Sequence, residues 1–226
     1  MFFFGVSSHR LDPDFGWHIA GGQDILSHGI RRVDFFTYTA QGFPWINVEW
    51  LNDVLIAKLY SIGGYNLLVL LFSLLWTVSL MIVARIGTQT SHRLSSSMIL
   101  AAALLFEPYL GVRTELWMVL FVAIIYCMLI NPRKRIRWVL PLVFWLWAQL
   151  HGSWPAGIAL IGWWALFCER DTAEKRKLWL IALVGVIITF VNPYGINELF
   201  VIAQTGLDPT LKVNIGEWAP FWHGSP

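Results

Sequence analysis

From about residue 65 onward, the chain repeats long apolar runs separated by short polar joints. The runs cover residues 65–86, 94–110, 115–131, 138–150, 154–168 and 178–192. A helix needs roughly 20 predominantly apolar residues to cross about 30 Å of hydrocarbon, and several runs are somewhat shorter than that. The pattern predicts an all-α polytopic membrane helix bundle with about six transmembrane helices in residues 65–192.

The first 64 residues are more polar and are expected to form an outer loop that carries two interfacial helices. Asp12 before Pro13 predicts a helix start, because an aspartate caps free N–H groups and proline fits the first helical position. This helix is expected to reach about His28 and to stop at Gly29, since glycine commonly ends helices.

The second helix is expected from near Asn47 to Gly63-Gly64, after an irregular loop over residues 30–46. Residues 1–6 are apolar but too short to span a bilayer, so they are interpreted as the stump of a missing first span. Residues 193–226 are interpreted as an outer segment that leads into a missing C-terminal part. The chain is therefore expected to be the N-terminal part or a fragment of a longer protein.

Composition supports the membrane class. Hydrophobic residues make up 57% of the chain and charged residues 13%, and the mean hydropathy is +0.59, which is more apolar than a soluble core requires. The net charge of +2 does not indicate a nucleic-acid partner. Cys127 and Cys168 lack a CxxC spacing, so a disulfide framework or zinc site is not expected.

Basic residues gather in alternate joints, which by the positive-inside rule belong in the cytoplasm. These joints contain Arg85 and Arg93; Arg133, Lys134, Arg135 and Arg137; and Arg170, Lys175, Arg176 and Lys177. The intervening joints at residues 107–113, 150–155 and 192–195 would then face outside, together with residues 12–53. Every unusual polar motif is therefore expected on one side of the bilayer.

Two pairs of ionisable residues in that outer segment are candidates for chemistry. Asp14 and His18 are four residues apart, as are Glu49 and Asp53, so each pair shares a helix face. A carboxylate beside an imidazole can hold a proton, a cation or a substrate hydroxyl.

Each acid also has a structural interpretation. Asp12 is explained by a helix cap alone, Asp14 by the helix dipole and Asp34 by a loop turn. His151 is either a hydrogen-bonded interface residue or part of the site. Three aromatic residues of the outer segment are candidates for stacking on a sugar face, namely Trp17, Trp45 and Trp50.

Several motifs together resemble the GT-C glycosyltransferase superfamily, in particular bacterial multi-spanning proteins distantly related to protein mannosyltransferases and the lipid A aminoarabinose transferase. The motifs are Asp12-Pro-Asp-Phe-Gly-Trp-His18, Gly21, His28-Gly29, Asp34-Phe-Phe-Thr-Tyr-Thr, Gly42-Phe-Pro-Trp, Glu49-Trp-Leu-Asn-Asp53, Leu150-His-Gly-Ser and Asn192-Pro-Tyr-Gly. The resemblance implies inverting transfer of a sugar from a polyprenyl-phosphate donor to a glycan, lipid or protein acceptor. It also implies a multi-pass protein of the bacterial inner membrane that acts at the outer face.

The resemblance carries the catalytic acid over to Asp14 or Asp12 and leaves that choice open. The lipid-phosphate leaving group needs positive charge, which Arg113, Arg31 or Arg32 would supply, or a divalent cation such as Mg²⁺ or Mn²⁺. Further residues expected to bind substrate are His18, Asp34, Glu49, Trp50, Asp53, Arg113 and His151. Related sequences commonly have Arg-Pro-Gln where this chain has Arg113-Thr-Glu115.

The rival interpretation is a transporter, or a non-catalytic membrane partner in envelope-polysaccharide assembly. A transporter is expected to place charged side chains near the middle of the membrane on broken helices. The apolar runs of this chain are almost free of charge at their centres, which favours a site at the outer interface.

Overall fold

The computed structural model describes residues 12–88 and 111–214, and within these ranges the regular elements are helices. An isolated antiparallel bridge joins Val33 and Pro44 in the loop between the first two helices. The predicted all-α class is confirmed for the described residues. The apolar run at residues 94–110 lies outside them.

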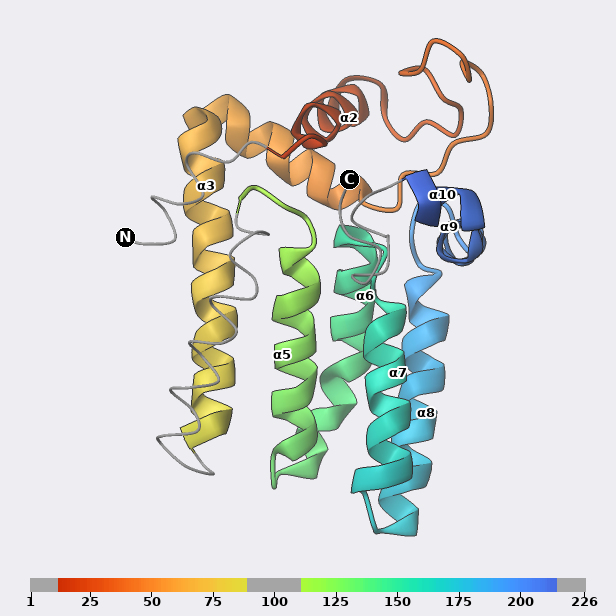
Figure 1. Ribbon diagram of the computed structural model, residues 1–226. Helices are drawn as coiled ribbons and strands as arrows, with labels where there is room; N and C mark the ends of the chain where they lie inside the picture. The colour runs from red at the N-terminus through yellow and green to blue at the C-terminus, as the bar shows by residue number, and fades with distance from the viewer. Residues whose placement is uncertain (1–11, 89–110, 215–226) are drawn as a thin grey trace.

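Long helices run side by side along one axis and form the body of the molecule (Figure 1). They are α3 (Trp50–Thr88), α5 (Leu116–Ile130), α6 (Leu140–Leu150), α7 (Pro155–Trp163) and α8 (Thr172–Thr189). A 3₁₀ helix, Lys134–Val139, leads into α6, and a π turn, Trp164–Cys168, extends α7. The contacts pair α6 with α8 and α3 with α5.

A second layer covers one end of this bundle. It contains α2 (Phe15–His28), the first part of α3, α9 (Asn197–Leu207) and α10 (Pro209–Asn214) (Figure 1). Helix α3 bends at Gly64, whose φ of 61° and ψ of −160° break the helix. Glycine adopts this left-handed backbone region readily. The sequence prediction of a helix end at Gly63-Gly64, followed by a new apolar run, therefore agrees with the bend.

Two predicted helix starts need correction. Helix α2 begins at Phe15, so Asp14 rather than Asp12 occupies the N-cap position; Asp12 instead accepts a hydrogen bond from the Asp14 N–H at 2.8 Å in the preceding turn. Helix α8 begins at Thr172 and not near residue 178, because Asp171 caps it by accepting from two backbone N–H groups. The predicted end of α2 before Gly29 agrees with its φ of 78°.

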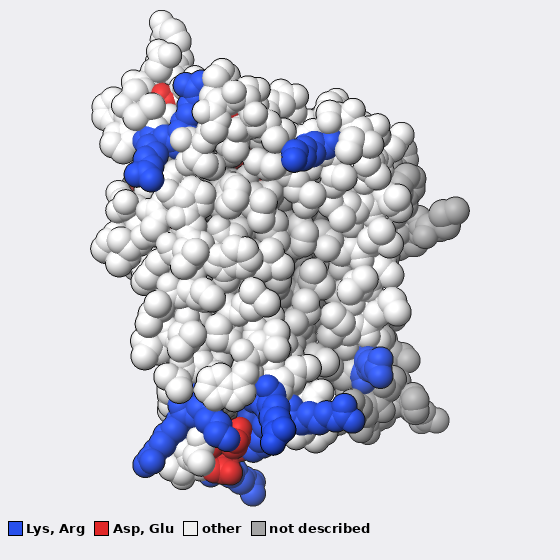
Figure 2. Space-filling view, turned by 180° about the vertical axis from the view of Figure 1, so that it is seen from behind, with Lys and Arg blue, Asp and Glu red and all other residues white. Residues whose placement is uncertain are grey.

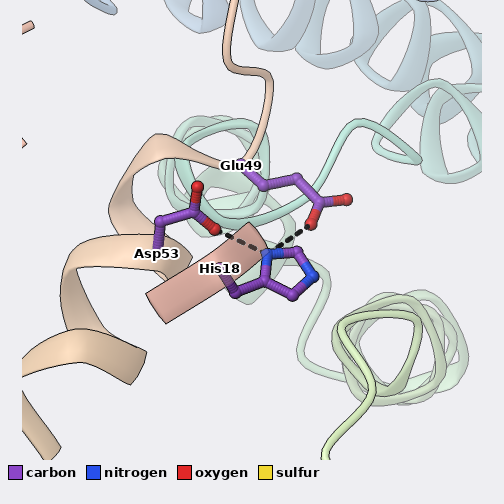
Figure 3. Close-up of side chains that lie close together, drawn as sticks. All are labelled: His18, Glu49 and Asp53. Carbon is purple, nitrogen blue, oxygen red and sulfur yellow. Dashed lines mark hydrogen bonds and ion pairs between the residues drawn. The ribbon is translucent and has the colours of Figure 1, made fainter. Parts of the chain in front are cut away.

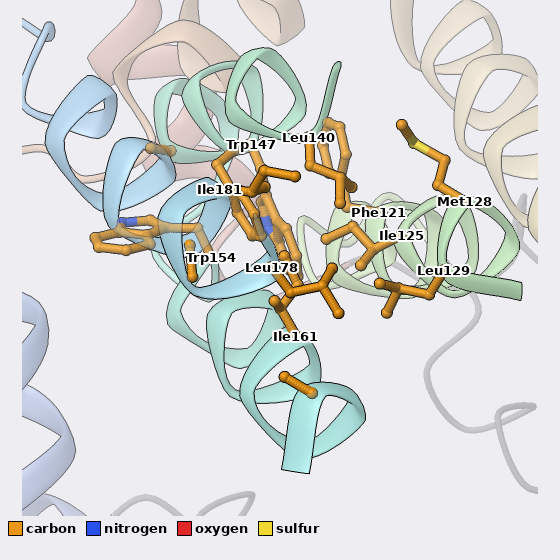
Figure 4. Packing of buried hydrophobic residues seen from close by; sticks show 14 of the residues in the cluster. Phe121, Ile125, Met128, Leu129, Leu140, Trp147, Trp154, Ile161, Leu178 and Ile181 are labelled. Atoms are coloured by element: carbon orange, nitrogen blue, oxygen red, sulfur yellow. The ribbon is translucent and has the colours of Figure 1, made fainter. Parts of the chain in front are cut away.

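The bundle is held by close packing around aromatic side chains (Figure 4). Phe121 and Trp147 stack with centroids 5.3 Å apart, and both are buried. At Gly157 a Cβ would come within 2.6 Å of the Trp147 ring and 2.7 Å of Phe144. Helices α5, α6 and α7 therefore approach closely only because glycine occupies this position.

Charged side chains gather at the two ends of the molecule and leave a broad uncharged zone between them (Figure 2). The lower end in this view carries most of the Lys and Arg. By length and composition, one helix of the described residues, Trp50–Ile86, could cross a membrane, and Leu116–Ile130 and Pro155–Cys168 are shorter apolar helices.

Candidate functional site

The site is built where α2 lies against the first part of α3. Gly21 and Gly22 face Asp53 at this contact: a Cβ on Gly22 would lie 2.0 Å from the Asp53 carbonyl oxygen, and one on Gly21 would lie 2.8 Å from its carboxylate. No larger residue fits there without separating the two helices. The glycine pair thus brings the polar face of α2 onto the start of α3.

Asp53 is the centre of the polar cluster. Its Oδ1 lies 2.7 Å from Nδ1 of His18, and its Oδ2 accepts a hydrogen bond from Nδ2 of Asn47 at 2.6 Å. The Asn47 side chain also accepts from the backbone N–H of Glu49 at 2.9 Å. Because a carboxylate can only accept, the bond to Asp53 places a hydrogen on Nδ1 of His18.

Glu49 lies between two histidines. Its Oε2 is 3.9 Å from Nδ1 of His18, and its Oε1 is 3.2 Å from Nε2 of His151. Figure 3 shows one nitrogen of the His18 ring, Nδ1, facing both carboxylates. The structure brings His18 together with Glu49 and Asp53, and His151 joins them from the end of α6.

The tautomer of His151 follows from its neighbours. The backbone N–H of Ser153 donates to Nδ1 of His151 at 3.1 Å, so this nitrogen is an acceptor. The Ser153 hydroxyl lies 2.7 Å from the same nitrogen and itself accepts from Nε1 of Trp147. A neutral His151 therefore carries its hydrogen on Nε2 and donates it to Glu49.

Burial and neighbouring charges shift the protonation of these groups. Burial raises the pKa of Glu49 to about 8, with the charge of Asp53 adding to the effect. Burial lowers the pKa of His151 to about 4, and the charge of His18 acts in the same direction. Burial opposes a charged His18, but the hydrogen bond and charge of Asp53 outweigh it and raise the pKa of His18. Asp53 thus favours the charged form of His18, and burial favours a protonated Glu49.

Two adjoining pockets open beside this cluster, and Asp14, His18 and Glu49 line both. The larger, of about 490 Å³, is closed on its other sides by Thr114, by the His151 turn and by α9. The smaller, of about 320 Å³, has an aromatic wall of Trp17 and Trp45. These two rings are nearly parallel at 18°, with centroids 6.5 Å apart. Ligand pockets commonly have such volumes and a few convergent polar groups.

The two candidate catalytic acids have different surroundings. Asp14 is exposed, and its carboxylate has no partner among the described side chains, so it is available to a ligand. Asp12 is buried, with its Oδ2 2.6 Å from Nε of Arg113. Arg113 also lies 3.8 Å from Glu115. Both Asp12 and Arg113 are thus engaged in an ion pair at the edge of the site.

Two other predicted substrate-binding residues are occupied elsewhere. Asp34 closes a loop turn by accepting from the backbone N–H groups of Phe36 and Thr37, and hydrogen bonds from Thr37 lower its pKa. Trp50 donates from Nε1 to the Gln149 side chain at 3.1 Å and so ties α3 to α6. The structural interpretation of Asp34 as a turn residue matches this geometry.

Among the described residues, one group of side chains could bind a divalent cation. One ligand atom each from His18, Glu49 and Asp53 lies within 4.8 Å of the other two. Carboxylate oxygens with an imidazole nitrogen suit Mn²⁺ better than Mg²⁺, which prefers oxygen alone. Binding there would require His18 to give up the Nδ1 hydrogen that it now shares with Asp53.

Some residues of the site were not expected from the sequence. Asn47 and Ser153 orient the charged groups, and Gly22 permits the close approach of α2. An asparagine side chain in a turn commonly accepts a hydrogen bond from the backbone N–H two residues further on. Asn47 accepts such a bond from Glu49. Ser153 gave no comparable signal, because its role depends on the packing of Trp147 from another part of the chain.

Comparison with protein-family models, curated proteins and solved structures gives no match to this chain.

Proposed function

We propose that this chain carries the active site of a polytopic membrane glycosyltransferase. It would transfer a sugar from a polyprenyl-phosphate donor to a hydroxyl acceptor at the outer face of a bacterial inner membrane. One observation carries the proposal: Asp14, whose carboxylate has no partner among the described side chains, and His18, whose charged form Asp53 stabilises, line the same two pockets. Such a transfer needs an acceptor for the hydroxyl proton and a cation for the leaving phosphate.

The contacts support one assignment of roles. The acceptor hydroxyl attacks the anomeric carbon while the bond from that carbon to the phosphate oxygen breaks, and Asp14 accepts the hydroxyl proton. Polyprenyl phosphate leaves with the bonding electrons, and Nε2–H of His18 donates to it. Asp53 holds the imidazole in place through Nδ1. Arg113, the cation expected from the sequence, supports the site through its ion pair with Asp12.

The distribution of charge supports the membrane orientation. The basic residues of the joints at 133–137 and 170–177 lie at the end of the bundle opposite α2 (Figures 1 and 2). Under the positive-inside rule this end faces the cytoplasm and the pockets face outside. The titratable cluster also lies at the end of the bundle, which disfavours a transporter with its site at mid-membrane.

The test is to reconstitute the purified protein in proteoliposomes with a panel of polyprenyl-phosphate sugars and hydroxyl acceptors. The proposal expects release of polyprenyl phosphate together with a glycosylated acceptor of inverted anomeric configuration. If the protein binds such lipids but releases no polyprenyl phosphate with any acceptor, the non-catalytic partner interpretation replaces the transferase.

A further inference from the structure

The basic end of the bundle contains a pocket of its own. It has a volume of about 550 Å³ and lies between α8 and the 3₁₀ helix that leads into α6. Its charged lining residues are Arg133, Lys134, Arg135, Arg137, Lys177 and Glu174. Cations therefore outnumber acids along its wall, and the segments that line the pocket lie at the end of the bundle opposite α2 (Figure 1).

Some of these cations are already neutralised. Glu169 accepts from Nζ of Lys134 at 3.1 Å and from Nη1 of Arg137 at 3.0 Å, and Glu174 accepts from Lys177 at 2.6 Å. Desolvation opposes ionisation of Glu169, but the hydrogen bonds from Arg137 and Lys134 outweigh it and lower the pKa of Glu169 to about 2. Lys134, Arg137 and Lys177 are therefore already paired with acids.

Arg133 and Arg135 differ from the other cations. Both are exposed, and neither guanidinium makes an ion pair or hydrogen bond with the described residues. A guanidinium presents paired N–H donors that match phosphate oxygens, so two of them beside one pocket form a receptor for a phosphate group.

Apolar side chains continue from this pocket toward the uncharged zone. Trp138 lines the pocket and is 51% exposed, and Leu142, one helical turn further along, is 57% exposed. Figure 2 shows the Lys and Arg residues bordering the uncharged zone at this end. A ligand that fits both surfaces has a phosphate headgroup and a hydrocarbon chain, and tryptophan commonly lies at that boundary.

We propose that this pocket binds the headgroup of an anionic phospholipid, with the phosphate on Arg133 and Arg135 and an acyl chain along Trp138 and Leu142. Basic pockets between helices on the cytoplasmic side of membrane proteins bind such headgroups. The proposal depends on the bundle lying in a bilayer and not on sugar transfer at the opposite end.

The test compares two double variants that lose the same charge. Arg133→Gln with Arg135→Gln removes the proposed receptor, whereas Arg170→Gln with Arg176→Gln removes two exposed cations outside the pocket. Each purified protein is equilibrated with mixed phosphatidylglycerol and phosphatidylcholine, and retained lipids are counted by native mass spectrometry. We expect the pocket variant to lose selective retention of phosphatidylglycerol by about tenfold or more, and the control to keep it.

Equal losses in both variants would overturn the proposal, because they would show diffuse attraction to the whole basic end. Binding of soluble glycerol phosphate as tightly as the lipid would also overturn it, since the acyl chain would then contribute nothing. A third variant, Arg133→Lys with Arg135→Lys, controls for folding. It keeps the charge but loses the paired donors, so it should retain part of the selectivity at an unchanged melting temperature.

Discussion

Nδ1 of His18 lies 2.7 Å from Oδ1 of Asp53, although 35 residues separate them in the chain. Asp53→Asn keeps the shape of the side chain but removes the charge that raises the pKa of His18. We expect the variant to bind polyprenyl-phosphate sugar more weakly than the unchanged protein at pH 8, and the difference to be smaller at pH 6, because acid favours the charged imidazole in both proteins. A pH series of lipid binding checks this. His28→Gln, which removes an exposed histidine paired with Asp24, is the control and should bind normally at both values.

The packing of α2 on α3 depends on Gly22. In Gly22→Ala the new methyl group would lie 2.0 Å from the Asp53 carbonyl and 2.7 Å from the Ala57 side chain, so we expect a loss of about 1–3 kcal/mol or more of stability. Gly16→Ala is the matched control in the same helix. It meets nothing within 4 Å and should be neutral or stabilising by up to about 1 kcal/mol. Thermal unfolding in detergent measures both, and equal melting temperatures would contradict the close approach.

The raised pKa values of two carboxyl groups predict that stability falls as the pH rises toward 8. Folding raises the pKa of Glu49 from 4.5 to about 8, and likewise that of Glu198, in both cases chiefly by burial. Between these values the folded protein holds protons that the unfolded chain has lost, so stability falls as pH rises from about 4.5 to 8, by at most about 1.4 kcal/mol per pH unit for each group. His151 acts in the opposite direction between about pH 4 and 6.5, because its pKa is lowered.

The free energy of unfolding is therefore expected to fall chiefly between pH 6.5 and 8, and denaturant unfolding across this range measures it. Glu49→Gln and Glu198→Gln should each flatten the decline, because glutamine does not titrate. If the slope of the Glu49→Gln variant equals that of the unchanged protein, Glu49 does not hold its proton in the folded state.

Local features of the sequence predicted much of the fold, while the site required knowledge of contacts between distant segments. Gly29 and Gly64 end helices through their own backbone angles, which explains why both stops were predictable. The predicted start of α8 was wrong, because the charged residues after Asp171 were assigned to a polar joint. In the structure Asp171 caps the helix and these residues form its first turns. The pairs Asp14 with His18 and Glu49 with Asp53 could be recognised from the sequence, because the residues of each pair are four positions apart. The engagement of Arg113 by Asp12 could not, because 101 positions separate these residues in the sequence.

The orientation in the membrane can be tested with cysteine labelling. Cys168 is exposed beside the basic end and serves as a native probe for that side. Gln41 is exposed in the loop after α2, so Gln41→Cys in a Cys168→Ser background probes the other side. We expect a membrane-impermeant maleimide to label position 41 in intact spheroplasts, and to label Cys168 only after permeabilisation. Labelling of both from the same side would contradict the proposed topology.

The most direct test of the account is the rate of sugar transfer by Asp14→Asn beside that of Asp12→Asn. The exposed Asp14 carboxylate is proposed to accept the hydroxyl proton, so its loss should lower turnover by about 10² to 10⁴-fold while the melting temperature stays unchanged. Asp12 is engaged by Arg113, so Asp12→Asn should mainly lower stability and leave turnover within about tenfold of the original value. Full transfer activity in a folded Asp14→Asn protein would contradict the account.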